Sequence, residues 1–203
     1  MRIKHLVIPP FRHWRIEADV HRSAHPTLLN YRFLARLRLK TMISLTPEPP
    51  IADMVNFCKD GAMQLEHFTV ARCRDEEPLT ISPQQASFTY AVAQVLSILI
   101  VPSRLPALVH GLDGLVITGV VAACLRKLQC WNHQALVAEF CRACRVDALE
   151  KHIEKFILDF SEEVVIGPEL PPWLWGGQRG HFHPTIKVRH DPPLQVKSDR
   201  LLD

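Results

Sequence analysis

The feature that most constrains this chain is the alternation of short apolar runs with segments of helical periodicity. Short runs suited to buried strands are found at 40–45, 63–70 and 105–110. Helical spacing of apolar residues is found at 28–37, 52–60, 83–100, 118–131, 132–144 and 147–160. No element is predicted before residue 28. Because strands that alternate with helices form parallel pairs, this order predicts an α/β fold: a central, mostly parallel sheet flanked by helices.

Two regions are predicted from the change in composition near residue 166. Residues 1–165 hold all the periodic apolar segments, and 203 residues with 47% hydrophobic side chains are enough for one well-packed domain. Residues 166–203 are rich in proline and show little periodicity. We therefore expect a globular domain at 1–165 and a Pro-rich C-terminal extension at 166–203 that has no core of its own.

Charge, cysteine usage and the N-terminal residues exclude several classes of protein. A net charge of +3 without a clustered basic face gives no reason to expect nucleic-acid binding. The apolar run at 1–10 is too short for a signal peptide or a membrane span. Six irregularly spaced cysteines, with a single CxxC pair at Cys141 and Cys144, read as core residues of a protein in a reducing compartment. We expect a cytoplasmic protein that does not bind membranes.

A glycine-rich turn between the strand 105–110 and the following apolar helix is the strongest candidate for a binding site. Backbone amides and a helix N-terminus in this arrangement can surround a phosphate group. Glycine-rich turns more often only reverse the chain, and that alternative stays open on the spacing alone. The candidate loop consists of His110, Gly111, Leu112, Asp113, Gly114, Leu115, Val116, Ile117, Thr118 and Gly119.

Four segments together resemble one known family. They are Val20-His-Arg-Ser-Ala-His-Pro26, the strand region at 37–49, Val109-His110, and the helix region Ala123-Cys-Leu-Arg-Lys-Leu-Gln-Cys-Trp131. In this order and spacing they resemble the plant-and-fungal atypical dual-specificity phosphatases of the cysteine-dependent tyrosine phosphatase superfamily. The chain is most similar to a divergent fungal branch grouped around oxidant-induced cell-cycle arrest. The resemblance implies a dual-specificity-phosphatase-like sheet, and active relatives are phosphatases of inositol pyrophosphates or phosphoproteins.

The chain departs from that family in the loop itself. Gly111 stands where the family has its nucleophilic cysteine, and Ile117 stands where it has the arginine that holds the phosphate oxygens. Leu115 and Val116 fall on basic positions of the family, and Asp113 adds a negative charge. The resemblance therefore implies a degenerate phosphate loop with no catalytic residue.

The general acid of the family also has no counterpart. Alignment through Glu77-Pro78 places Pro83 or Gln84 at that position, and neither side chain can donate a proton to a leaving alkoxide. No cysteine in the chain is followed six residues later by an arginine, so a displaced copy of the motif is excluded.

Two features of the C-terminal extension are candidates for further sites. His181 and His183, considered with His190, stand two residues apart in a proline-rich stretch with no cysteine or carboxylate fixed nearby, so we expect no metal site, and no cofactor is indicated. Trp173 and Trp175 either pack back on the domain or bind a partner, and the sequence does not decide between them.

These observations support one leading hypothesis and two alternatives. The leading one is a catalytically inactive phosphatase-like protein that serves as a scaffold or regulatory subunit, with a protein partner that could be a related active phosphatase. The first alternative is a weak, non-hydrolysing binder of inositol phosphates or phosphoproteins. The second is a weak phosphatase.

Overall fold

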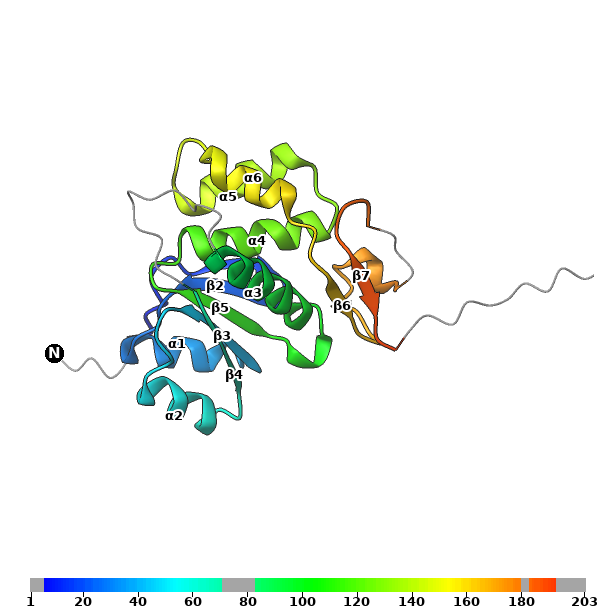
Figure 1. The fold of residues 1–203 in the computed structure, drawn as a ribbon. Helices are drawn as coiled ribbons and strands as arrows, with labels where there is room; N and C mark the ends of the chain where they lie inside the picture. Colours follow the sequence, from blue (N-terminus) through cyan, green and yellow to red (C-terminus); the bar gives the residue numbers. More distant parts are fainter. Residues whose placement is uncertain (1–5, 71–82, 180–182, 193–203) are drawn as a thin grey trace, which may run out of the picture.

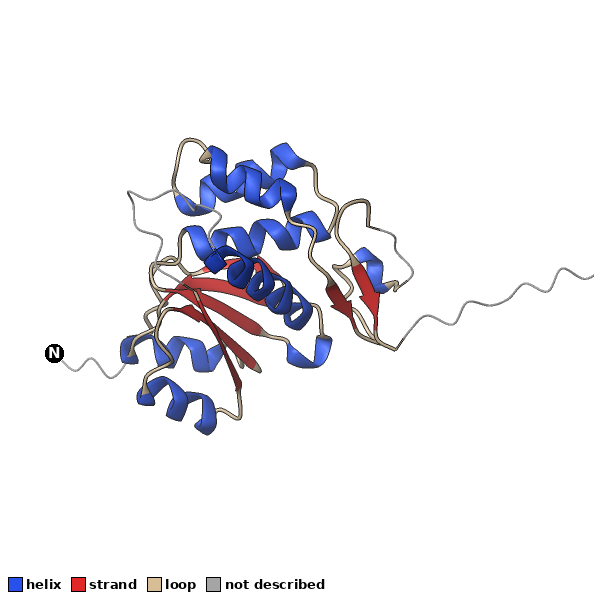
Figure 2. Cartoon of the chain, in the orientation of Figure 1, coloured by secondary structure: helices blue, strands red, loops and turns tan. Residues whose placement is uncertain are grey.

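A computed structural model of the protein describes residues 6–70, 83–179 and 183–192, with the backbone alone for 83–87. The chain forms a five-stranded central sheet between two layers of helices, and a small two-stranded sheet lies beside it (Figures 1 and 2). No helix in this part of the chain combines the length and the apolar character needed to cross a membrane.

The central sheet has the strand order β1-β2-β5-β3-β4. Its strands are β1 (Trp14–Glu17), β2 (Val20–Ala24), β3 (Thr41–Thr46), β4 (Gln64–Thr69) and β5 (Ala107–Gly111). The pairs β2–β5, β5–β3 and β3–β4 are parallel, and only the hairpin of β1 with β2 is antiparallel. All residues of β2, β3 and β5 are buried, as expected for central strands that are covered on both faces.

Helices cover the two faces of this sheet unequally. One face packs against α3 (Pro83–Leu99) and α4 (Val116–Leu128), with α5 (His133–Cys144) and α6 (Lys151–Asp159) outside them (Figure 1). The other face packs against α1 (Tyr31–Arg36), which follows the short 3-10 helix η2 (Leu28–Asn30), and α2 (Ala52–Asp60). The predicted α/β fold with a mostly parallel sheet is confirmed.

The hairpin of β1 and β2 is an addition to the predicted elements. Its second strand reads Val-His-Arg-Ser-Ala, which lacks the apolar alternation of a surface strand, yet all five residues are buried. The strands predicted at 40–45, 63–70 and 105–110 correspond to β3, β4 and β5, and α4 begins at Val116 rather than at Thr118.

The segment after residue 165 packs on the main core. Its strands β6 (Val164–Ile166) and β7 (Val188–His190) pair in parallel, and η4 (Trp175–Gly177) is a single 3-10 turn. Four side chains beyond residue 165 are buried in the largest core cluster: Ile166, Leu170, Leu174 and Ile186. Trp173 and Trp175 are half-buried against this cluster, and the Trp175 indole donates to the carbonyl of Leu128 at 3.0 Å. Both tryptophans thus pack back on the domain.

Candidate functional site

The glycine-rich turn connects the central strand β5 to the buried helix α4. The strand ends at Gly111 and the helix begins at Val116, so the turn proper is Leu112–Leu115. Gly114 has φ +71°, and a Cβ atom there would lie 2.4 Å from the backbone nitrogen of Ala24. Only glycine permits this close approach of the turn to the end of β2.

All four carbonyl groups of the turn Leu112–Leu115 accept hydrogen bonds from the N-terminal part of the chain. The His25 amide donates to the carbonyl of Leu112 at 3.3 Å, and the Arg12 guanidinium donates to the carbonyl of Asp113 at 2.8 Å. The Arg22 guanidinium donates to the carbonyls of Gly114 and Leu115 at 2.9 and 3.0 Å. Each bond fixes the orientation of one peptide group, so the turn is held from outside by three residues that are distant in sequence.

The amides of the turn take the opposite direction. In a trans peptide the N–H points away from the C=O, so the N–H groups of residues 113–116 point away from the anchoring side chains. One of them, the Leu115 amide, donates to Oδ1 of Asp113 at 2.8 Å. The first amides of α4 have no partner within the helix, and they carry the positive end of its dipole. The turn therefore presents backbone donors suited to a phosphate group.

Arg22 places a positive charge directly behind these donors. Its side chain on β2 is 2% exposed, and its remaining contact is with Sγ of Cys144 at 3.5 Å. In the described parts of the chain no carboxylate lies within ion-pair distance of this guanidinium, and its Nε has no hydrogen-bond partner. A buried cation without a counter-ion is costly. The arrangement favours an anion on the other side of the turn.

A second buried arginine, Arg126 of α4, ties the hairpin to the helices. It makes a bidentate ion pair with Glu139, with distances of 2.7 and 2.8 Å, and a further ion pair with Glu17 of β1. It also donates to Oε1 of Gln129 at 2.9 Å and lies 4.1 Å from the centre of the Trp131 ring. This network fixes the hairpin that carries Arg22 against the helix that follows the turn.

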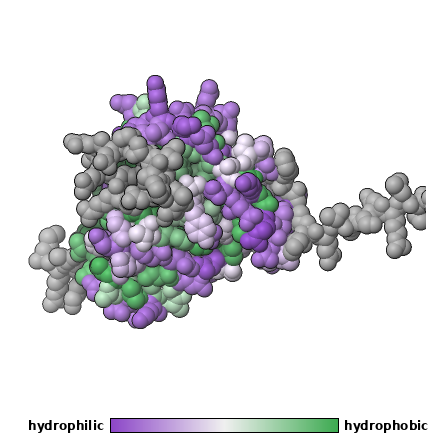
Figure 3. Space-filling view, viewed as in Figure 1, coloured by the Kyte–Doolittle hydropathy of each residue, from purple (hydrophilic) through white to green (hydrophobic). Residues whose placement is uncertain are grey.

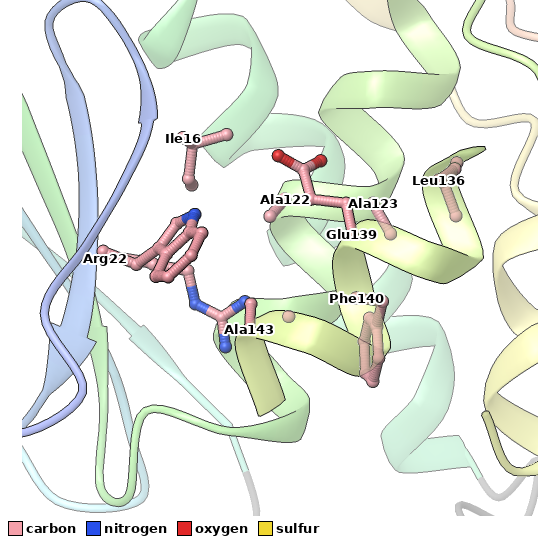
Figure 4. Close-up of a pocket in the computed structure, with 10 residues that line it drawn as sticks. Ile16, Arg22, Ala122, Ala123, Leu136, Glu139, Phe140 and Ala143 are labelled. Carbon is pink, nitrogen blue, oxygen red and sulfur yellow. The ribbon is translucent and has the colours of Figure 1, made fainter. Parts of the chain in front are cut away.

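The cavity between the hairpin and the helices is lined in part by small residues of α4 and α5. Figure 4 shows Arg22, Glu139 and Phe140 around it, with the backbone of α4 between them. A Cβ atom at Gly119 would lie 2.7 Å from the Phe140 ring, so this glycine allows α5 to pack closely on α4. Thr118, which precedes this glycine in the candidate loop, is 1% exposed.

Positions 111 and 117 carry no side chain able to react with phosphorus. Gly111 is buried at the end of β5, where an added Cβ would make an ordinary contact of 3.5 Å with Cγ2 of Thr118. Ile117 is 8% exposed and belongs to the main core cluster. A cysteine would fit at position 111, whereas an arginine at position 117 would have to turn out of the core.

Two histidines lie beside the turn: His110, the first residue of the candidate loop, and His25, which was not singled out from the sequence. His110 is fully buried, and burial first, then the nearby His25, lowers its pKa to about 3. Burial also lowers the pKa of His25, whose ring lies 5.2 Å from that of His110. Both rings are therefore neutral at pH 7, and Nδ1 of His25 has no partner among the described residues. The sequence signal that could have identified His25 is its place just after β2, because β2 pairs in parallel with β5 and the two strands end at the same edge of the sheet.

The other predicted site residues lie apart from the turn or outside the described residues. Pro83 and Gln84, the predicted positions of the degenerate general acid, form the start of α3, and the preceding residues 71–82 lie outside the described residues. Nδ1 of His183 accepts from two backbone amides and its Nε2 lies 2.8 Å from the carbonyl of Lys127, so this ring has a structural role. Within residues 6–70, 83–179 and 183–192, no group of three or more metal-ligating side chains is brought together.

The fold, with an anion-suited turn between its central strand and a buried helix, is that of a phosphatase of the cysteine-dependent type. A family described as "Tyrosine phosphatase family" matches residues 7–179, and the chain belongs to this family.

The chain is also similar to individual phosphatases, in sequence and in structure. The chain is 34% identical over 163 residues to "Putative tyrosine-protein phosphatase OCA1" of Mycosarcoma maydis, a match that covers 80% of this chain and 98% of the relative. It is 29% identical to "Inositol diphosphatase DSP4" of Arabidopsis thaliana, over 68% of this chain and 66% of the relative. The core catalytic domain of the phosphatase SIW14 of S. cerevisiae, solved with citrate, superposes with a TM-score of 0.65 and 26% identity, over 77% of this chain and 89% of that one.

These relatives correct the leading functional hypothesis drawn from the sequence. They are named as tyrosine-protein phosphatases and an inositol diphosphatase, and the similar structure is a catalytic domain. The comparisons therefore point to phosphatase function, and the interpretation of the chain as an inactive scaffold or a non-hydrolysing binder is wrong. It gave two positions, Gly111 and Ile117, more weight than the rest of the chain.

Proposed function

We propose that the protein is a phosphatase of low turnover that holds a phosphate group at the turn Leu112–Leu115 and transfers it to water. The observation that carries this proposal is Arg22, a buried cation with no carboxylate partner in the described residues, bonded to the back of the turn. The turn amides supply hydrogen bonds to the phosphate oxygens, and Arg22 supplies the compensating charge. Membership of the tyrosine phosphatase family supports the reaction type.

Water is the proposed nucleophile because Gly111 has no thiol to attack phosphorus. The oxygen of water forms the new bond to phosphorus while the bond from phosphorus to the substrate oxygen breaks. One proton of the water passes to a base, and the leaving oxygen takes a proton from solvent. The products are the dephosphorylated alcohol or phenol and inorganic phosphate, and no covalent intermediate with the protein is formed.

His25 is the proposed base. Its ring is neutral at pH 7, its Nδ1 is without a partner in the described chain, and its own backbone amide is bonded to the turn. General bases of this kind typically contribute about 10²–10⁴ to a rate. His110 is the weaker candidate, since its full burial and its pKa of about 3 make it a poor proton acceptor.

The absence of the thiolate and of the loop arginine sets the expected rate. A single well-placed donor to a transition-state oxygen contributes about 10²–10³ to a rate, and the covalent route is lost as well. We therefore infer turnover that is well below that of a phosphatase with both groups, yet above the rate in buffer.

Phosphate release from a phosphotyrosine peptide by the purified full chain tests the proposal. Activity is expected to follow the protein through a final size-exclusion step, and His25→Asn is expected to lower it at least tenfold. His152→Asn serves as the matched control, because His152 lies on α6 away from the turn. Release that separates from the protein peak, or that survives in His25→Asn, would count against the proposed reaction.

Installing the missing groups provides a second test. The double variant Gly111→Cys/Ile117→Arg is expected to raise turnover at least 100-fold, since the thiolate and the guanidinium would meet an already formed turn. Gly111→Cys alone is expected to change turnover less than tenfold, because groups that act as a unit are not recovered singly. A double variant that folds, as shown by circular dichroism, but gains nothing would show that the turn does not hold phosphate.

A further inference from the structure

The turn Leu112–Leu115 has no cation of its own on the side where its amides point. Arg22 lies behind the turn, and Ile117 is buried at the position where the family has its arginine. The charged side chain of the turn is that of Asp113, a carboxylate that accepts from the Leu115 amide. Because this negative charge opposes an incoming phosphate, a bound phosphate needs a cation from another element.

The end of α5 lies beside this turn. Sγ of Cys144, the last residue of α5, is 3.7 Å from the carbonyl oxygen of Leu115, and a Cβ atom added at Gly119 of α4 would lie 3.2 Å from the same sulfur. In Figure 1 the end of α5 and the beginning of α4 lie on the same side of the molecule, because the two helices run in opposite directions. The next residue is Arg145, and consecutive Cα atoms are only about 3.8 Å apart, so this arginine lies next to the turn.

Arg145 has a backbone conformation that favours glycine. Its φ and ψ are 57° and 45°, in the left-handed region, at the position that ends α5. The amides of Arg145 and Val146 both donate to the carbonyl of Cys141, which is the pattern of a helix that ends with a left-handed residue. Glycine is usual there because other side chains destabilise this conformation. An arginine therefore costs stability at this position, which indicates a role for its side chain.

The Arg145 side chain is exposed and has no partner in the described part of the chain. No ion pair or hydrogen bond of its guanidinium is found within residues 6–70, 83–179 and 183–192. The nearest charged residues in sequence are Arg142 on α5 and Asp147, and both are exposed. In Figure 3 the surface at the top, where Figure 1 places α5 and α6, is mainly hydrophilic. No described contact thus keeps the guanidinium from turning toward the turn.

We propose that Arg145 supplies the guanidinium that position 117 lacks, and that its side chain holds two oxygens of a phosphate bound at the turn Leu112–Leu115. This inference rests on the proposed phosphatase function and adds a catalytic residue to it. The planar fork of the guanidinium binds two phosphate oxygens at once, while the turn amides bind from the other side. As water attacks phosphorus, the guanidinium stabilises the negative charge on these oxygens, and Arg145 transfers no proton.

An NMR titration of the full chain with inorganic phosphate tests this assignment. Arg145→Gly is expected to weaken phosphate binding at least tenfold and, at the same time, to raise the melting temperature, because glycine suits the left-handed conformation. A residue with a purely structural role would not lower the affinity. Arg38→Gly is the matched control: Arg38 is also exposed and left-handed, with φ 51°, but it precedes β3 and so lies at the edge of the sheet opposite the turn.

Binding and turnover are measured separately, so the assignment and the proposed reaction can fail separately. An affinity for phosphate that falls in Arg145→Gly but not in Arg38→Gly supports the assignment, even if the parent releases no phosphate from the phosphotyrosine peptide and the proposed hydrolysis fails. Equal affinities of Arg145→Gly and the parent, or equal losses in Arg145→Gly and Arg38→Gly, would overturn the assignment, while phosphate release by the parent would leave the hydrolysis standing. A parent protein that binds no phosphate would overturn both.

Discussion

Replacing Arg126 by methionine is expected to be among the most destabilising single changes in the domain. The substitution keeps most of the side-chain volume but removes the charge that Glu139 and Glu17 share. Breaking a buried ion pair by removing one partner typically costs about 3–5 kcal/mol, because the other charge is left buried and unpaired. The carboxylates here are 22% and 21% exposed, so partial hydration places the expected loss near the lower end, at about 3 kcal/mol.

Urea unfolding followed by circular dichroism measures this loss, and a thermal scan should show a fall of roughly 6–12 °C for a domain of this size. Arg189→Met is the matched control, since Arg189 pairs with Glu163 at the surface with both side chains about half exposed. Its expected loss is small, because exposed ion pairs are well solvated and add little to stability. Equal losses for Arg126→Met and Arg189→Met would refute the argument that the network holds the hairpin against α4 and α5.

Three further changes follow from burial and packing. Acidification should destabilise the fold, because histidine has a pKa near 6.5 in the unfolded chain whereas the buried His110 has a pKa of about 3. The stability that neutral His110 contributes is therefore full above pH 6.5 and is lost as the pH falls toward 3. Urea unfolding of His110→Gln should show a smaller loss of stability between pH 7 and pH 4.5 than the parent protein does, and an equal loss would contradict this. Leu174→Ala should cost about 2–5 kcal/mol, as its side chain is fully buried, and unchanged stability would show that the C-terminal segment adds nothing. Gly119→Ala should lower the melting temperature, because the added Cβ would lie 2.7 Å from a ring carbon of Phe140 on α5. Gly167→Ala should leave the melting temperature unchanged, because no atom lies nearer than 4.0 Å to its added Cβ. Equal effects of the two variants would argue against close packing of α4 on α5.

The strands and helices from residue 28 to residue 160 could be predicted because each carries one clear period. The strands β3 and β5 read Thr-Met-Ile-Ser-Leu-Thr and Ala-Leu-Val-His-Gly, and all their residues are buried, as in a parallel sheet covered on both faces. The strand β2 could not be found in this way, because its buried residues include His21, Arg22 and Ser23. The side chains of Arg22 and Ser23 make hydrogen bonds there instead of burying apolar surface.

The C-terminal segment shows a second limit of periodicity. Leu170 and Leu174 have helical spacing, but Pro171 and Pro172 between them rule out a helix interior, and Ile186 lies too far along the chain to extend a pattern. They are buried one at a time against a core made by other elements. The side-chain bond from Trp175 to Leu128 joins residues 47 apart in sequence, which no local pattern reports.

The position of the turn could be predicted from its glycines and its flanking elements, but its anchoring could not. The bond from Arg22 to Gly114 spans 92 residues, and that from Arg12 to Asp113 spans 101. The sequence also drew attention to what positions 111 and 117 lack. His25, which lies beside the turn, became a candidate only when the structure brought its loop next to β5.

The outside anchoring of the turn Leu112–Leu115 has a consequence for how such a protein can change over time. The groups that hold its shape, Arg12, Arg22 and the His25 amide, belong to a different part of the chain from positions 111 and 117. Substitutions at those two positions leave all four anchoring bonds in place. Selection can thus replace the reacting groups while the frame is inherited intact, and descendants of one fold can acquire new chemistry without first losing their architecture.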